Sequence, residues 1–241
     1  IGGAGAGSLL VVIELLEGSL HDLISNSSTR IPTALCLRLA HETAQGIAYL
    51  HRNNMLHRDI KPSNVLLDKL QHAKVCDFGL SRPYTLSREA LADLDLAPDL
   101  LEGSANPSAD GGSYSSAGGG GDNQLSHTAD STFAVGTLRY MAPEVMQRTD
   151  EAVKIRYDAY SDVYSFGILL WELSHRETPF AGHDGVQVAV KVAPSGQRPL
   201  MQLPAGLSAL GPLIAACWHV DPAQRPTMAI CAERLRALEK L

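Results

Sequence analysis

The chain has 241 residues, of which 45% are hydrophobic, so it can form one large domain or two small ones with a sizeable core. Its net charge of −6 argues against a general nucleic-acid binder, and no apolar run reaches the roughly 18 residues that a membrane span requires. Four cysteines without paired spacing and nine histidines without a metal-ligand rhythm argue against a disulfide framework and a zinc site, and they favour a reducing, cytoplasmic compartment.

The N-terminal part predicts a linker followed by a buried strand. Residues 1–8 are rich in glycine, but nothing precedes them and Ser8 stands where a nucleotide-binding loop needs a third glycine, so we interpret them as a flexible linker. Leu9–Leu16 is an apolar run typical of a buried strand. Because the chain begins at Ile1 rather than Met, we expect it to be a piece of a longer protein.

Helices and a hairpin are expected next. A short helix is predicted over His21–Ser25 and a long one from Pro32 to about Asn53, where apolar residues recur at helical spacing. Val65–Leu67 and Ala73–Cys76 predict short strands around a turn. This hairpin would place the residues at its two ends close together.

Residues 83–130 differ in composition from the rest of the chain. The segment contains eight acidic residues and one arginine, so its net charge of −7 accounts for the −6 of the whole chain. Its part from 103 to 121 is dominated by Gly and Ser and cannot bury enough apolar surface to order itself, which predicts a mobile surface insertion. Further helices are expected over Ala159–Leu173, Leu207–Trp218 and Met228–Leu241.

The most informative stretch runs from His57 to Asn64 and is followed by Asp77. Two carboxylates, an ammonium and an amide stand here at spacings suited to the transfer of a phosphoryl group. Asp59 can accept the proton of an attacking hydroxyl, and Lys61 can offset charge that develops on the phosphate. Asn64 and Asp77 offer the hard oxygen ligands that Mg²⁺ prefers.

Five motifs in this order resemble those of eukaryotic protein kinases. They are His57-Arg58-Asp59-Ile60-Lys61-Pro62-Ser63-Asn64, Asp77-Phe78-Gly79, Gly136-Thr137-Leu138-Arg139-Tyr140-Met141-Ala142-Pro143-Glu144, Ser161-Asp162-Val163-Tyr164-Ser165-Phe166-Gly167, and Cys217-Trp218 with Asp221-Pro222 and Arg225-Pro226. The Lys61-Pro62-Ser63-Asn64 version resembles serine/threonine kinases. The run from Tyr164 to Glu172 resembles the tyrosine-kinase-like group of that class.

The resemblance implies an α+β fold. Residues 9–241 would form a partial kinase domain, mainly the α-helical large lobe with the last small-lobe strand and the hinge, and residues 83–130 would lengthen its activation segment. The glycine-rich loop and the phosphate-pairing lysine of the family have no candidates in the chain, so the small lobe is expected upstream. The implied activity is transfer of the terminal phosphate of ATP, with Mg²⁺, to Ser or Thr hydroxyls of protein substrates. A non-catalytic kinase-like interaction module and an incomplete fragment without activity of its own remain open as alternatives.

The resemblance also implies roles in binding the nucleotide and the metal. Asn64 and Asp77 are the expected metal ligands. The residues expected around the nucleotide are Ile13 behind the adenine, the hinge with Glu14 and Leu16, Leu66 beneath the adenine, and Asp77 at the phosphates.

A further group is expected to have structural or regulatory roles. Its members are His57, Arg58, Phe78, Thr137, Glu144, Asp162 and Arg225. Thr137 is expected near Asp59, and Asp162 is expected to accept hydrogen bonds from the catalytic-loop backbone. Glu144 and Arg225 are expected to form a buried ion pair.

Control by phosphorylation is a further expectation, because a phosphate can be held bidentately by a guanidinium such as that of Arg58. The candidate acceptors are Ser126, Thr128, Ser131 and Thr132. The alternative that these residues merely make a loop polar stays open for each of them.

Overall fold

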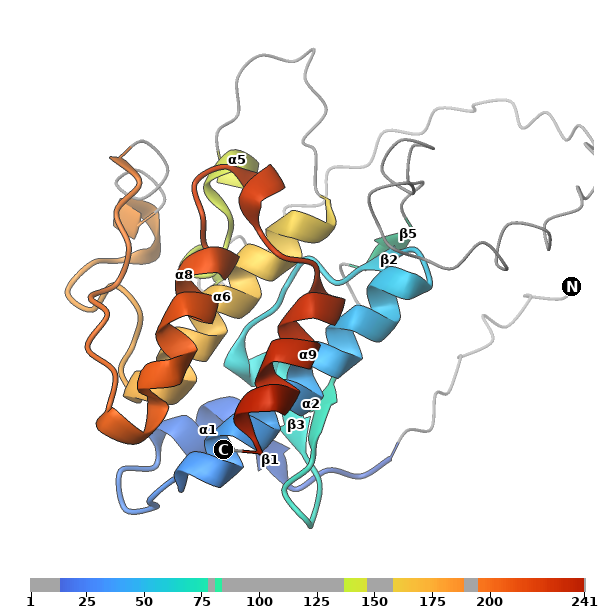
Figure 1. Cartoon of the computed structure of the whole chain (residues 1–241), viewed down its shortest axis with the longest axis vertical. Coiled ribbons are helices and arrows are strands. Elements are labelled where there is room, and N and C mark those ends of the chain that lie inside the picture. Colours follow the sequence, from blue (N-terminus) through green and yellow to red (C-terminus); the bar gives the residue numbers. More distant parts are fainter. Residues whose placement is uncertain (1–13, 78–80, 84–136, 147–157, 189–194, 241) are drawn as a thin grey trace, which may run out of the picture.

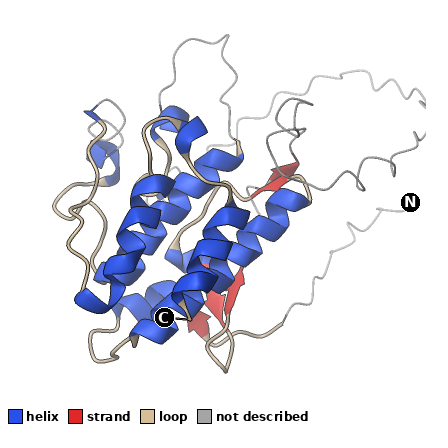
Figure 2. Ribbon diagram, in the orientation of Figure 1, coloured by secondary structure: helices blue, strands red, loops and turns tan. Residues whose placement is uncertain are grey.

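The computed structural model describes residues 14–77, 81–83, 137–146, 158–188 and 195–240. Within these residues helices dominate, and short strands lie at the edges of the helical body (Figure 2). The expected linker, Ile13, Phe78, the four candidate phosphosites and the expected insertion beyond Pro83 lie outside the described residues.

The elements follow one another as a mixture of helices and small antiparallel sheets, which is the predicted α+β class (Figure 1). The α-helices are α1 (Leu20–Ser25), α2 (Thr33–Arg52), α5 (Pro143–Met146), α6 (Ala159–His175), α8 (Gly211–Cys217) and α9 (Met228–Leu238). The 3₁₀ helices are η1 (Pro62–Asn64), η4 (Ala205–Leu210) and η5 (Pro222–Gln224). The strands are β1 (Gly18–Ser19), β2 (Met55–Leu56), β3 (Val65–Leu67), β4 (Ala73–Val75) and β5 (Arg82–Pro83).

Helix α2 has the length predicted from its apolar spacing. Pro32 precedes it in an extended conformation, and Asn53 ends it. Its buried face packs along α9 and against β4 (Figure 1). A Cβ atom at Gly46 would lie 2.8 Å from Val75 Cγ2, so the missing side chain lets β4 approach the helix.

Helix α6 is the central element of the core. Asp158 caps its start by accepting hydrogen bonds from the N–H groups of Tyr160 and Ser161, and Arg176 ends it with a left-handed φ of 57°. Every residue from Ser161 to Ser174 is buried, which an ordinary surface helix does not show. This helix therefore presents side chains to elements on all sides.

The three-stranded sheet has the order β1-β3-β4, and all its pairs are antiparallel. The predicted hairpin is present, with Val65 opposite Val75 and Leu67 opposite Ala73. A second pair joins β2 to β5. The β1–β3 and β2–β5 pairings each join a segment before the catalytic loop to a segment after it.

Two predicted elements differ from the structure. Glu14, Leu15 and Leu16 do not form a strand, and Leu15 is 86% exposed, so the strand prediction is wrong for these residues. The backbone pairing with β3 begins at Glu17, whose N–H donates to Leu67 O at 2.9 Å. The single helix predicted over Leu207–Trp218 is divided into η4 and α8, because Pro212 in the first turn of α8 has no N–H to continue a hydrogen-bond ladder.

The four cysteines are free, and three of them are buried. Cys217 Sγ and Cys231 Sγ lie 3.6 Å apart in the core, where α8 approaches α9. Burial raises the pKa of the Cys36 thiol to about 12, which makes it unreactive.

Among the described residues, no helix combines the length and the apolar character needed to cross a bilayer.

Candidate active site

The loop from His57 to Lys61 lies between β2 and η1, and α6 fixes its first residues. Arg58 has a φ of 71°, in the left-handed region that non-glycine residues seldom occupy. The N–H groups of His57 and Arg58 both donate to Asp162, to Oδ2 and Oδ1, at 2.9 Å each. His51 Nε2 lies 2.9 Å from the same Oδ2. A carboxylate that is only 1% exposed thus holds a strained stretch of backbone in place.

The side chain of Asp59 is the centre of the site. Its Oδ2 accepts hydrogen bonds from Lys61 Nζ at 2.7 Å and from Asn64 Nδ2 at 2.8 Å. Its Oδ1 accepts one from Thr137 Oγ1 at 3.2 Å, and Lys61 Nζ also donates to that hydroxyl at 3.0 Å. The structure therefore brings Asp59, Lys61 and Asn64 together with Thr137, which lies more than 70 residues further along the chain.

Asp77 reaches the same region through the β3–β4 hairpin. Cys76 N–H donates to Asn64 O at 2.9 Å, so the residue before Asp77 is bonded to the backbone of the other predicted metal ligand. Cys76 O lies 2.9 Å from His57 Nε2, while Asp59 N–H donates to His57 Nδ1 at 3.3 Å. These partners require the proton of a neutral His57 ring to be on Nε2. Asp77 itself is exposed and has a φ of 64°.

The donor atoms of Asn64 and Asp77 fit a magnesium ion. Asn64 Nδ2 donates to the backbone and carboxylate oxygens of Asp59, which fixes the orientation of the amide and leaves its Oδ1 directed elsewhere. No group of three His, Cys, Asp or Glu side chains able to hold a metal occurs among the described residues. Proteins commonly supply only one or two oxygen ligands to Mg²⁺, and phosphates and water supply the others. One amide and one carboxylate are therefore enough for such a site.

The residues expected to contact the adenine lie at the three-stranded sheet. Leu66 is half-buried in β3, opposite Ser19 of β1. Glu14 is exposed and forms an ion pair with Lys74 of β4 at 3.4 Å, while Leu16 is half-buried. Glu14 thus lies beside β4, and Leu16 precedes Glu17, whose N–H bonds to β3; Asn64 comes directly before β3, and Asp77 lies two residues after β4.

The segment from Thr137 to Ala142 contains polar residues whose contacts we did not predict. Tyr140 Oη donates to Glu172 Oε2 of α6 at 2.6 Å. Burial raises the pKa of the Glu172 carboxyl to about 7, although the hydrogen bond from Tyr140 lowers it in part. The sequence does contain a signal for this contact: Glu172 lies inside an apolar helical run, and a buried carboxyl needs a hydrogen-bond partner.

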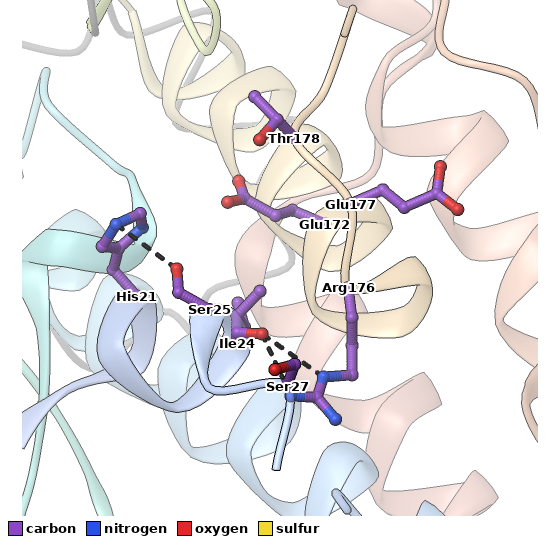
Figure 3. Close-up of a pocket in the computed structure, with 8 residues that line it drawn as sticks. All are labelled: His21, Ile24, Ser25, Ser27, Glu172, Arg176, Glu177 and Thr178. Carbon is purple, nitrogen blue, oxygen red and sulfur yellow. Dashed lines mark hydrogen bonds between the residues drawn. The ribbon is translucent and has the colours of Figure 1, made fainter. Parts of the chain in front are cut away.

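A hollow of ≈ 340 Å³ lies between α1, the loop after it and the end of α6 (Figure 3). Glu172 and Glu177 line it but point in opposite directions, and Arg176 donates to Ile24 O from below (Figure 3). None of the predicted catalytic, metal-binding or nucleotide-binding residues lines this hollow. It therefore gives no support to a nucleotide site at this end of α6.

The ion pair expected between α5 and the segment before α9 is present. Arg225 donates to both carboxylate oxygens of Glu144, at 2.6 Å and 3.0 Å, and its side chain is 0% exposed against 28% for Glu144. Arg225 also donates to Tyr160 O at 2.9 Å. Its guanidinium lies 5.1 Å from the centroid of the Tyr164 ring, so the pair is joined to the core of α6.

Comparison with protein families gives two matches along the chain. The model described as "Protein kinase domain" matches residues 5–106. The model described as "Protein tyrosine and serine/threonine kinase" matches residues 122–235. The first range contains Asp59 and Asp77, and the second contains Thr137, Glu144 and Arg225.

Comparison with curated proteins gives relatives with similar names. The chain is 33% identical over 221 residues to a "probable serine/threonine-protein kinase" of Dictyostelium discoideum. It is 30% identical over 232 residues to serine/threonine-protein kinase STY17 of Arabidopsis thaliana, and 34% identical over 237 residues to receptor-interacting serine/threonine-protein kinase 3 of Rattus norvegicus. These alignments cover 91%, 96% and 95% of the chain but only 19%, 32% and 41% of the relatives. The chain thus spans less than half the length of these relatives.

Proposed function

Because the chain belongs to the protein kinase family, we propose that it carries the catalytic loop of a serine/threonine kinase, which transfers the terminal phosphate of ATP to Ser or Thr hydroxyls of protein substrates. The observation that supports this most strongly is the set of hydrogen bonds from Lys61, Asn64 and Thr137 to the carboxylate of Asp59. The names of the relatives agree with this activity.

In this proposal Asp59 orients the substrate hydroxyl and accepts its proton. Among the described residues, the hydrogen bond to its Oδ1 comes from Thr137, and a carboxylate oxygen has a second lone pair that can accept the hydroxyl of a substrate. The carboxylate is 8% exposed and held by two donors on Oδ2, so it needs little rearrangement when the hydroxyl arrives. Lys61 keeps a positive charge beside the reacting oxygen, where it offsets negative charge spread over the transferred phosphate.

Asn64 and Asp77 would hold Mg²⁺ in this proposal, and Glu14, Leu16 and Leu66, with Ile13, would contact the nucleotide. When bound, the metal neutralises charge on the ATP phosphates. The hydrogen bond from Cys76 N–H to Asn64 O holds the residue before Asp77 against Asn64. It would therefore keep the two proposed metal ligands close to each other. We further propose that Ser126, Thr128, Ser131 and Thr132 are regulatory phosphate acceptors whose phosphates Arg58 would bind, and that the protein acts in the cytoplasm.

The test is a phosphoryl-transfer assay on the full-length protein with Mg-ATP and a library of Ser- and Thr-centred peptides. Asp59→Asn and Asp77→Ala should each lower the rate at least about a hundredfold, since general acid–base and charge-stabilising groups contribute that much. Asp68→Asn is the matched control, because Asp68 lies at the opposite end of the same hairpin and only caps its turn.

The alternatives give different outcomes in the same assay. A non-catalytic interaction module predicts no transfer by the wild-type protein and no effect of Asp59→Asn on partner binding. Wild-type turnover retained by Asp59→Asn would show that another group is the base. Turnover retained by Asp77→Ala would remove the proposed metal ligand.

A further inference from the structure

Arg139 connects the segment that carries Thr137 to a distant turn. Its Nη1 donates to Pro179 O at 2.9 Å and to Phe180 O at 3.3 Å, and its Nη2 donates to His183 O at 2.6 Å. All three acceptors are main-chain carbonyls of one turn, residues 179–183, which follows α6. A single half-buried guanidinium thus replaces the hydrogen bonds that secondary structure would otherwise give this turn.

The turn is shaped to receive this guanidinium. Phe180 and Gly182 have φ values of 56° and 86°, both in the left-handed region. His183 N–H donates to Phe180 O at 3.2 Å, which closes the turn, and the Phe180 side chain is buried in the core. Because three carbonyl oxygens converge on one point, they need a donor that offers several N–H groups in a plane, and arginine is the side chain that does so.

The segment is fixed on either side of Arg139. Two residues before it, the Thr137 hydroxyl contacts Asp59 and Lys61. One residue after it, Tyr140 donates to Glu172, and Tyr140 N–H donates to Thr137 O at 3.0 Å. Arg139 therefore lies between a contact with the catalytic loop and a contact with α6, and its side chain reaches a third element.

We infer that Arg139 is a positioning residue of the phosphoryl-transfer reaction: its guanidinium fixes residues 137–140 beside Asp59, so that Thr137 and the backbone around it form the surface on which the protein substrate is held. This inference rests on the proposed function. It assigns Arg139 a role toward the protein substrate and not toward ATP. When the guanidinium is removed, Asp59 keeps its hydrogen bonds from Asn64 and from Lys61.

The experiment measures two reactions of the full-length protein with Mg-ATP: phosphorylation of the best peptide from a Ser- and Thr-centred library, and hydrolysis of ATP without peptide. Arg139→Gln should lower kcat/KM for the peptide roughly ten- to hundredfold, mainly through KM, as expected for a misplaced substrate. The KM for ATP and the rate of ATP hydrolysis should stay within about twofold of wild type. Arg139→Lys should behave like Arg139→Gln, because an ammonium keeps the charge but cannot serve three separate carbonyls.

Arg176→Gln is the matched control. Arg176 also donates to main-chain carbonyls of a loop, those of Ile24, Asn26 and Thr29, but it does not contact residues 137–142 among the described residues. Its loss should reduce the two reactions to the same extent, through the folded fraction alone. Thermal unfolding of each variant reports that fraction.

The outcomes separate this inference from the proposed function. Equal loss of both reactions in Arg139→Gln, unchanged peptide kinetics, or full recovery by Arg139→Lys would each overturn the positioning role. If neither Arg139 variant folds, the residue is structural and the inference is withdrawn. A wild-type protein inactive in both reactions refutes the proposed function, and the inference fails with it.

Discussion

The two ends of α6 bury carboxylates in different ways. Near the start, Asp162 is 1% exposed and accepts hydrogen bonds from two backbone N–H groups, with His51 also in contact. Near the end, Glu172 is 3% exposed, and the donor recorded for it among the described residues is Tyr140 Oη. A buried carboxylate organises its surroundings only when enough donors compensate for lost hydration. The same helix thus contains one charge that holds a loop and one carboxyl that is close to protonation.

The largest difference between the two ends should appear when each carboxylate becomes an amide. Asp162→Asn places an N–H group against the donors of His57 or Arg58, and we expect it to lower the free energy of unfolding by about 3–5 kcal/mol. Urea unfolding at pH 7 measures this loss. A change below 1 kcal/mol would mean that the catalytic-loop backbone does not depend on this carboxylate.

A second change tests the start of α6 from outside the helix. Glu144→Gln leaves Arg225 buried with only carbonyl partners and one neutral oxygen, so we expect a loss of about 2–4 kcal/mol. The exposure of Glu144, 28%, makes this effect smaller than that of Asp162→Asn. Unfolding of the Glu144→Gln, Arg225→Met double variant provides the control, because removing both partners should restore part of the stability. If the double variant loses the sum of the two single losses, the pair is not coupled.

The end of α6 should make the stability depend on pH through Glu172. Because the folded-state pKa of Glu172 is about 7 against an ordinary 4.5, the native state binds more protons than the unfolded state between these values, and its stability falls as pH rises through them. Glu172→Gln keeps an acceptor for Tyr140 and removes the titration. We expect the variant to gain about 1–3 kcal/mol relative to wild type between pH 5 and pH 8. Denaturation curves at several pH values check this, and a gain that is independent of pH would contradict the raised pKa.

Local sequence patterns were sufficient for the long elements. The spacing of apolar residues predicted α2, and the continuous apolar run predicted the buried helix α6. The order of the motifs predicted that Asp59, Lys61 and Asn64 would share a site, and they do so through direct hydrogen bonds. These predictions succeeded because helical periodicity and short loop spacing depend on residues that are close in the chain.

Features that depend on distant residues could not be predicted in this way. The left-handed backbone of Arg58 exists because a carboxylate more than 100 residues away accepts its N–H. The three carbonyls that receive Arg139 lie 40 or more residues beyond it, and no local pattern marks them. Leu15 likewise is apolar but 86% exposed, because the exposure of a side chain depends on which residues pack against it and not on its own hydropathy. Each of these requires knowledge of the tertiary structure.

The geometry of the β3–β4 hairpin determines where an inserted residue can be tolerated. Three residue pairs separate Asn64 from the tip, where Asp68 caps the turn. An extra residue within either strand would shift the register and rotate Asp77 to the opposite face, whereas an extra residue near the exposed Leu70 would leave the side chains of both proposed metal ligands in place. A library of single-residue insertions should therefore keep function at the tip and lose it in the strands.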